Sequence, residues 1–334
     1  MPINPNAKLV SNVLDLKSVE QVPTRKGYGE GLFEAGEKDE RIVALCADLT
    51  ESTQMHLFAK KFPKRFIEIG VAEQNLAAVA AGLANYGKIP FISSYAMFSP
   101  GRNWEQIRTT ICYNDVPVKI AGSHSGVSVG PDGATHQAIE DIAITRVIPN
   151  MVVIAPCDAN EAKKATLAAA ELNSPVYLRF TREKTPVCTT IETPFQIGRA
   201  EIFFESKKEK PDVAIISSGP LTHNALLAAN DLEKDGMGVI VVNSHTIKPL
   251  DEKIIIETAR KAGAIVTVEE HQIAGGMGSA VAELLSRNYP VPIEFVGVHD
   301  RFGESGVPGE LITAFGMGVS DIKKASILAN KRKS

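Results

Sequence analysis

Short, nearly continuous apolar runs recur along this chain and alternate with segments of helical periodicity. Six of them occupy the first half of the 334 residues: Ile42–Ala47, Phe66–Ile69, Ile89–Ser94, Val116–Gly122, Met151–Ala155 and Val176–Phe180. Helical patterns such as Glu161–Leu172 lie between most of them. Strands that are apolar on both faces are typical of a parallel sheet covered by helices on each side. The alternation therefore predicts an α/β fold with a doubly wound sheet.

The pattern breaks once and then resumes. Residues Glu183–Ile197 contain two prolines and four threonines without a helical period, which is typical of a linker. Helical patterns at Leu221–Leu232 and Leu250–Ala262 then separate four more apolar runs: Val213–Ser217, Val239–Val242, Ile265–Val268 and Ile293–Val298. A chain of this length commonly forms two domains. We predict a first domain at residues 1–190, with a polar lead-in at residues 1–20, and a smaller doubly wound α/β domain at residues 191–334.

Charge and cysteine content exclude several classes of protein. The 36 basic and 39 acidic residues give a net charge of −3, which provides no basic field for nucleic acid. The N-terminus lacks a signal segment, and the run Leu76–Leu83 is too short to span a bilayer. Gly275-Gly276-Met277-Gly278 resembles a dinucleotide loop, but Val281 takes the place of its third glycine. We expect a cytoplasmic protein without disulfides, because four cysteines lie far apart: Cys46, Cys112, Cys157 and Cys188.

Glu73 stands at an unusual place for a carboxylate. Leu76, Val79, Ala80 and Leu83 recur at the spacing of one helical face, and Glu73 precedes Leu76 by one turn on that face. Loss of water there favours the neutral, protonated form of a carboxyl group. A neutral carboxylic acid can give a proton to a heterocyclic nitrogen. The alternative is that Glu73 only stabilises the helix N-terminus through its charge.

Polar and aromatic side chains follow several of the predicted strands. In an open parallel sheet, ligands bind beyond the carboxyl ends of the strands, where these side chains would meet. The richest segment is residues 123–137, which holds two histidines, one aspartate and turn-forming glycines. Each residue alone is more often structural, but their concentration at one edge predicts a site. The candidates are Asp48, Ser52, Glu73, Tyr95, Phe98, His124, Asp132, His136 and Arg182.

Six short motifs occur in an order that resembles the transketolase family, in its pyrimidine-binding and C-terminal domains. They are Thr24-Arg25-Lys26, Ala47-Asp48-Leu49, Gly70-Val71-Ala72-Glu73, Asp132-Gly133-Ala134-Thr135-His136-Gln137, Pro149-Asn150-Met151 and Glu269-Glu270-His271. The resemblance runs from about Thr24 to the C-terminus. It implies a thiamine diphosphate-dependent transferase of the pentose phosphate pathway. Such an enzyme moves a two-carbon ketol unit from a ketose phosphate to an aldose phosphate.

The resemblance assigns roles to the residues that would meet the cofactor. Glu73 matches the family glutamate that hydrogen-bonds N1′ of the aminopyrimidine and so promotes loss of the thiazolium C2 proton. Tyr95 and Phe98 match aromatic residues that pack on the pyrimidine ring, and Asp48 matches an aspartate close to the cofactor. A third aromatic position of the family falls at Gly101, which predicts a looser pocket.

The resemblance also assigns the substrate site. Arg25, Ser52, His124 and Arg182 match the residues that clamp the substrate phosphate, for which charged donors from Arg and protonated His are well suited. Asp132 matches the residue that senses hydroxyl configuration. His136 matches a catalytic-site histidine that contacts the ketose hydroxyl groups.

The diphosphate and metal site of the family is not matched here. In the family, the Mg²⁺ or Ca²⁺ of the cofactor is held by Gly-Asp-Gly and a later Asn, because hard cations prefer oxygen ligands. Pro131-Asp132-Gly133 lacks the first glycine, and Asn160 precedes a helical pattern, where Asn and Asp act as N-caps. We predict no metal ligand in this chain. We expect instead a partner subunit with the diphosphate-binding domain, in an assembly of two copies of each chain.

Three alternatives stay open at this point. Deoxyxylulose-phosphate synthase shares the Thr-His-Gln motif, and the beta subunits of 2-oxo acid dehydrogenases share the two-chain layout. The phosphate clamp disfavours the oxo acid dehydrogenase, and an assay with pyruvate separates the synthase. A non-catalytic binding subunit is a different kind of answer, and the presence of Glu73 together with His124 and His136 argues against it.

Overall fold

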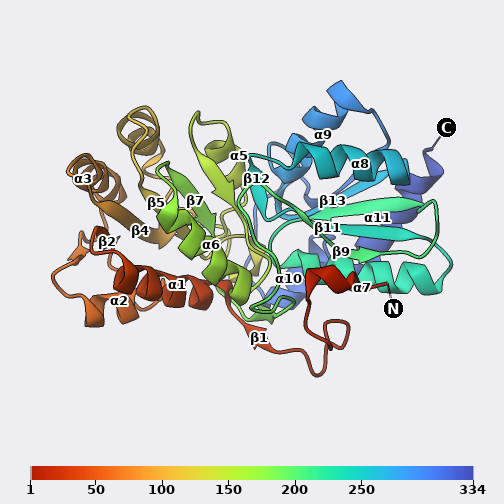
Figure 1. The fold of residues 1–334 in the computed structure, drawn as a ribbon, viewed down its shortest axis with the longest axis horizontal. Helices are drawn as coiled ribbons and strands as arrows, with labels where there is room; N and C mark the ends of the chain where they lie inside the picture. Colours follow the sequence, from red (N-terminus) through yellow and green to blue (C-terminus); the bar gives the residue numbers. More distant parts are fainter. Residues whose placement is uncertain (1, 334) are drawn as a thin grey trace.

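Two sheets hold most of the strands in the computed structural model, which describes residues 2–333 (Figure 1). The first sheet has seven strands in the order β12-β6-β7-β5-β4-β2-β3, and all neighbours are parallel except β12 and β6. This confirms the predicted doubly wound α/β fold. The strands are β2 (Ile42–Cys46), β3 (Phe66–Glu68), β4 (Ile89–Tyr95), β5 (Lys119–Ser123), β6 (Val152–Ile154), β7 (Val176–Arg179) and β12 (Thr246–Lys248).

Helices cover both faces of the first sheet. On one face lie α1 (Thr24–Lys38), α2 (His56–Lys61) and α6 (Ala159–Glu171). On the other lie α3 (Glu73–Asn85), α5 (Asp141–Arg146) and the short segment α4–η2, from Trp104–Gln106 to Ile107–Cys112. Glycines let α1 lie directly against α6, because a Cβ at Gly27 would stand 1.9 Å from the carbonyl oxygen of Ala159.

The second sheet has five strands in the order β14-β13-β10-β11-β9, with β9 antiparallel at one edge. Its faces are covered by α7 (Leu221–Lys234) and α11 (Val319–Lys331) on one side, and by α8 (Glu252–Ala262) and α9 (Met277–Asn288) on the other. The short helix α10 (Pro308–Ala314) precedes α11. The strands are β9 (Glu201–Glu205), β10 (Val213–Ser217), β11 (Val239–Asn243), β13 (Ile265–Gln272) and β14 (Ile293–Val298).

Two segments cross the predicted division near residue 190. The polar lead-in packs on the second domain: η1 (Pro5–Ala7) lies beside it, the amide of Asn4 donates to Phe203 O at 3.0 Å, and Val13 is buried. In Figure 1 this red segment lies next to α7. In the other direction, β12 leaves the second half of the chain and joins the first sheet. The boundary at residue 190 therefore stays a prediction.

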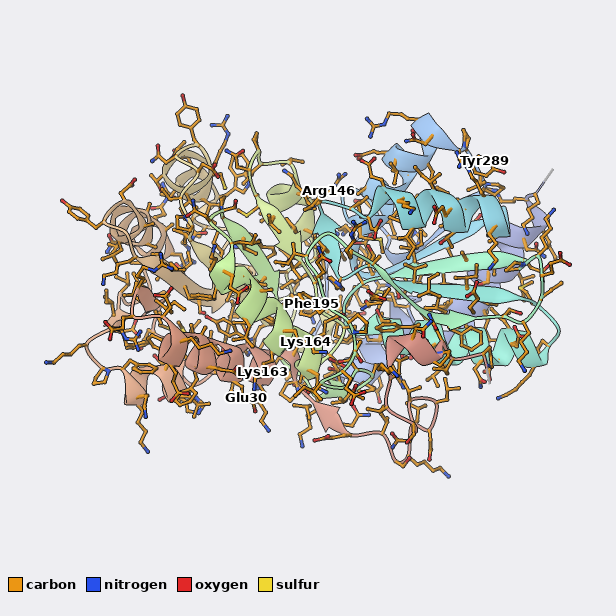
Figure 2. All side chains as sticks on the ribbon, in the orientation of Figure 1. Glu30, Arg146, Lys163, Lys164, Phe195 and Tyr289 are labelled. Atoms are coloured by element: carbon orange, nitrogen blue, oxygen red, sulfur yellow. The ribbon has the colours of Figure 1, made fainter. Side chains whose placement is uncertain are left out.

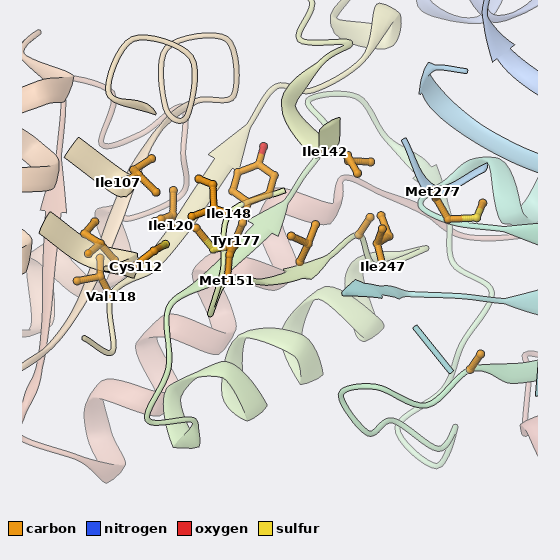
Figure 3. Packing of buried hydrophobic residues seen from close by; sticks show 14 of the residues in the cluster. Ile107, Cys112, Val118, Ile120, Ile142, Ile148, Met151, Tyr177, Ile247 and Met277 are labelled. Carbon is orange, nitrogen blue, oxygen red and sulfur yellow. The ribbon is translucent and has the colours of Figure 1, made fainter. Parts of the chain in front are cut away.

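One cluster of the apolar core contains residues of both domains. Figure 3 shows Ile107, Ile120 and Met151 of the first domain in the same cluster as Ile247 and Met277 of the second. The predicted linker contains β8 (Thr185–Pro186), which pairs with β1 (Gln21–Val22), and is otherwise irregular.

Two further contacts lie at the junction of the two halves of the molecule. Figure 2 places Phe195 between the domains, where its ring stacks on His245 with centroids 4.3 Å apart. Arg146, also at this junction, donates through Nε to the carbonyl oxygen of Gly275 at 2.5 Å. Among residues 2–333, no helix combines the length and the hydrophobicity that a bilayer crossing requires.

Candidate active site

Four aromatic rings predicted from the sequence meet at the carboxyl edge of the first sheet. Tyr95 ends β4, and its ring stacks on His124, which follows β5, with centroids 3.9 Å apart. Phe98 lies 6.4 Å from Tyr95 and 5.3 Å from the ring of His136, which it meets edge to face. The parallel register of β4 and β5 brings the segments after them together. These segments form a partly exposed aromatic wall that suits a planar ring.

Glu73 is the first residue of α3, and its side chain is only 1% exposed. Its Oε2 accepts a hydrogen bond from Nη1 of Arg102 at 2.6 Å, and its Oε1 accepts a long one from Ser94 at 3.4 Å. The burial follows the sequence prediction. The contact with Arg102 was not predicted, and it places a positive charge beside the buried carboxyl group. The side chain of Arg102 is 48% exposed and also lies over the ring of Phe98.

Two of the predicted phosphate-binding residues, Arg25 and Arg182, form a cationic cluster beside Ser52 and His124. Arg25, the second residue of α1, donates through Nε to the carbonyl oxygen of Arg182 at 3.1 Å and through Nη1 to that of Ser52 at 2.7 Å. Burial, together with the nearby charges of Arg25 and Arg182, lowers the pKa of His124 to about 3. The expectation of a protonated histidine is therefore wrong for the free chain: His124 is neutral at pH 7, and the positive charge rests on the two arginines.

The segment of residues 124–137 carries the other predicted substrate residues. Asp132 accepts a hydrogen bond from Nη1 of Arg182 at 3.1 Å, and the same nitrogen donates to the carbonyl oxygen of Val129 at 2.9 Å. Nδ1 of His136 lies 2.9 Å from the hydroxyl of Thr135. Arg182 also faces Glu183 at 3.6 Å, so its guanidinium lies between carboxylates rather than free of them.

Two other sequence predictions concern Asp48 and Gly101. Asp48 lies at the same edge, after β2, but its amide contacts Glu68 at 2.7 Å and no described contact joins it to the rings. At Gly101, a Cβ would stand 1.9 Å from the carbonyl oxygen of Met97. The turn therefore admits only glycine, and an aromatic side chain there would need a different backbone.

Sequence reasoning missed Arg102 and Glu68. Arg102 follows Glu73 by 29 residues, in a turn whose direction no local pattern reveals. Glu68 ends β3, and its Oε1 accepts from the amides of Asp48 at 2.7 Å and Gly70 at 2.8 Å. It thereby ties together the segments after two neighbouring strands. The sequence signal that could have identified Glu68 is its position, as a carboxylate at the end of a strand.

The two rejected sequence motifs have structural explanations. The glycine loop at residues 275–278 begins α9, and the carboxylate of Glu269 accepts from the amides of Met277 and Gly278 at 2.7 and 2.8 Å. The protein's own carboxylate thus fills the place where a phosphate would bind. The amide of Asn160 donates to the carbonyl oxygen of Thr189 at 2.7 Å. Within residues 2–333, no three His, Cys, Asp or Glu side chains are close enough to hold a metal ion.

Comparison with known sequences gives two matches along the chain. The model of the family described as transketolase, pyrimidine binding domain, matches residues 20–187. The model described as transketolase, C-terminal domain, matches residues 204–322. Together they cover every candidate site residue and the strands of both sheets apart from the start of β9.

Individual relatives agree with these matches. A provisionally assigned transketolase C-terminal section of Methanocaldococcus jannaschii is 45% identical over 90% of this chain and 94% of its own length. A subunit of a 6-deoxy-6-sulfo-D-fructose transketolase from a Clostridium species is 39% identical over 93% and 95% of the two chains. A solved structure described as a split gene transketolase, inactive beta4 tetramer, is 45% identical, with a TM-score of 0.87 over 94% of this chain and all of its own.

Longer relatives are matched over about half of their length. The chain is 36% identical to human transketolase and covers 49% of it. It is also 36% identical to a 1-deoxy-D-xylulose-5-phosphate synthase of Desulforudis audaxviator and covers 47% of that protein.

Proposed function

This chain belongs to the transketolase family, and we propose that it is the pyrimidine-binding subunit of a two-chain transketolase. In this role it transfers a two-carbon ketol unit from a ketose phosphate to an aldose phosphate. The observation that carries the proposal is the meeting of a buried carboxyl, an aromatic wall and a cationic cluster at one sheet edge: Glu73, Tyr95, Phe98, Arg25 and Arg182. The relatives of similar length are themselves described as a section or a subunit of a transketolase.

The residues present fit the pyrimidine half of thiamine diphosphate. When bound, this cofactor supplies a nucleophilic carbon whose activation depends on the protonation of its aminopyrimidine ring. Glu73 would hold a proton at Oε2 for the ring nitrogen, and Tyr95 and Phe98 would lie against the ring face. Arg102 donates to Oε2 at 2.6 Å, so its half-exposed guanidinium would have to move aside before a ring nitrogen could bond to that oxygen.

The cationic cluster supports a phosphorylated substrate. Arg25 and Arg182 bring two guanidinium groups to one point, and such groups bind phosphate through strong charge-assisted hydrogen bonds. His124 would add a neutral hydrogen bond rather than a charge. Asp132 and His136, on the neighbouring loop, would contact the sugar hydroxyl groups. The same cluster disfavours a 2-oxo acid dehydrogenase, whose substrate carries no phosphate.

A partner chain completes the proposal. It would hold the diphosphate and its Mg²⁺ or Ca²⁺, in an assembly of two copies of each chain. The solved relative described as an inactive beta4 tetramer supports the idea that a chain of this kind associates with itself and is inactive alone. A cytoplasmic location and a place in the pentose phosphate pathway are further parts of the proposal and rest on the family resemblance.

The test is a reconstitution with and without the partner. We expect no ketol transfer from the purified chain with thiamine diphosphate and Mg²⁺, and transfer once a diphosphate-binding transketolase subunit from the same host is added. Replacing the ketose phosphate donor by pyruvate separates the deoxyxylulose-phosphate synthase alternative. Robust turnover by the chain alone would contradict the proposal of a two-chain enzyme. Inactivity with every such partner would favour a non-catalytic binding subunit.

A further inference from the structure

Glu270 of the second domain reaches into the substrate loop of the first. Its Oε1 accepts a hydrogen bond from the amide of Ser128 at 2.6 Å, and its Oε2 accepts one from the hydroxyl of Ser128 at 3.2 Å. The two residues are 142 positions apart in the sequence. Glu270 is 3% exposed, so its carboxylate has lost water and relies on these donors. Glu270 is not among the residues proposed above to contact the cofactor or the substrate.

The substrate loop is shaped to receive this carboxylate. Gly126 has a φ of +79°, and a Cβ there would lie 2.3 Å from Oε1 of Glu270, so no side chain fits. The second domain also contacts the far end of the loop, where Nε2 of Gln137 donates to the carbonyl oxygen of Glu304 at 2.9 Å. Residues 126–137 are therefore held from both ends by the second domain.

The contact leads directly to the cationic cluster. Ser128 is the middle residue of the single turn η3 (Val127–Val129). The carbonyl oxygen of the next residue, Val129, accepts a hydrogen bond from Nη1 of Arg182 at 2.9 Å. Fixing Ser128 therefore fixes the carbonyl that orients the guanidinium of Arg182.

We propose that Glu270 is a positioning residue that sets the orientation of Arg182 through Ser128 and thereby the affinity for the phosphate end of the substrate. The identity of that substrate rests on the proposed function. The contacts of Glu270 with Ser128 and of Arg182 with Val129 do not depend on it. In this role the second domain stabilises the loop that orients Arg182.

Glu269 offers a matched control for the test. It is the neighbouring residue of β13, is equally buried, and also accepts hydrogen bonds from two groups, the amides of Met277 and Gly278. It contacts its own domain and not the loop. We would compare Glu270→Ala and Glu270→Gln with Glu269→Ala and Glu269→Gln. The glutamine variants keep one acceptor and cover the case in which an alanine variant fails to fold.

Amide hydrogen exchange in the isolated chain tests the link without catalysis. Glu270→Ala should speed exchange at Ser128 by about 10- to 150-fold, the loss expected for a hydrogen bond to a charged group, and Glu270→Gln by less. The Glu269 variants should leave Ser128 unchanged and speed exchange at Met277 and Gly278. Equal effects of both pairs on Ser128, or no effect of the Glu270 variants, would overturn the proposal.

Kinetics of the assembled enzyme test the consequence. The Glu270 variants should raise KM for phosphorylated sugars with little change in kcat, as expected when a binding interaction is lost uniformly. KM for glycolaldehyde, which carries no phosphate, should not move. An equal rise for both substrates would overturn the positioning role. Absence of ketol transfer by the wild-type assembly would contradict the proposed function, and the exchange measurement would still decide whether Glu270 holds the loop.

Discussion

The pair formed by Glu73 and Arg102 makes a quantitative prediction for the isolated chain. Arg102→Met removes the donor 2.6 Å from a carboxylate that is 1% exposed, while keeping an apolar side chain of similar length over Phe98. Hydrogen bonds to charged groups contribute about 1.5–3 kcal/mol. Arg102 is 48% exposed, so solvent screens its charge and we expect the lower part of that range, about 2 kcal/mol of lost unfolding free energy.

A double-mutant cycle separates this pair from general effects. In a Glu73→Gln background the buried group is neutral, and Arg102→Met should then cost less than about 0.5 kcal/mol, which leaves a coupling of about 1.5 kcal/mol. Urea denaturation of the four proteins at pH 7 measures the cycle. Arg108→Met, at an exposed arginine of the neighbouring segment η2, serves as the control and should change stability by less than about 0.5 kcal/mol. An equal cost of Arg102→Met in both backgrounds would refute the ion pair.

Three further predictions concern other parts of the site and the core. In the assembled enzyme, Glu73→Gln cannot supply a carboxyl proton and should lower kcat by about 10²–10⁴, measured at saturating cofactor; a loss below about threefold would contradict its role. Arg182→Ala should raise KM for phosphorylated sugars by about 10- to 150-fold and leave glycolaldehyde unchanged, and equal changes for both would remove the phosphate clamp. Burial, with Asp158 nearby, raises the pKa of Glu161 to about 7. Its stabilising contribution is then complete below about pH 4.5 and is lost as the pH rises to about 7, so the stability of Glu161→Gln relative to wild type should rise by about 3 kcal/mol over that range in urea titrations.

The sequence predicted those parts of the fold that leave a local pattern. Each apolar run that was predicted as a strand is a strand of one of the two sheets, and β10 and β14 have the predicted bounds. Strand β12 was missed because its three residues pair with β6, more than 90 positions away, and carry no alternation of their own. The lead-in was missed for the same reason: its order comes from contacts such as Asn4 with Phe203.

Some properties of the site could likewise be predicted from the sequence, and others could not. The topology of a parallel sheet makes the segments after β4, β5 and β7 meet, so Tyr95, His124 and Arg182 could be grouped before any coordinates were known. The charge state of a residue was harder to predict, because it depends on which side chains turn toward it. Glu73 gained a guanidinium partner from a turn, and His124 lost its proton to burial between two arginines.

The neutral state of His124 bears on how a phosphate would be bound. Its Nδ1 lies 2.9 Å from the hydroxyl of Ser123, which can donate to it and leave the proton on Nε2. A neutral imidazole with its proton on Nε2 donates one hydrogen bond without adding to the repulsion between Arg25 and Arg182. A bound phosphate dianion would reduce that repulsion and favour protonation of the ring. Burial of His124 therefore avoids a third positive charge beside the two arginines, while its Nε2 can still donate a hydrogen bond to a phosphate.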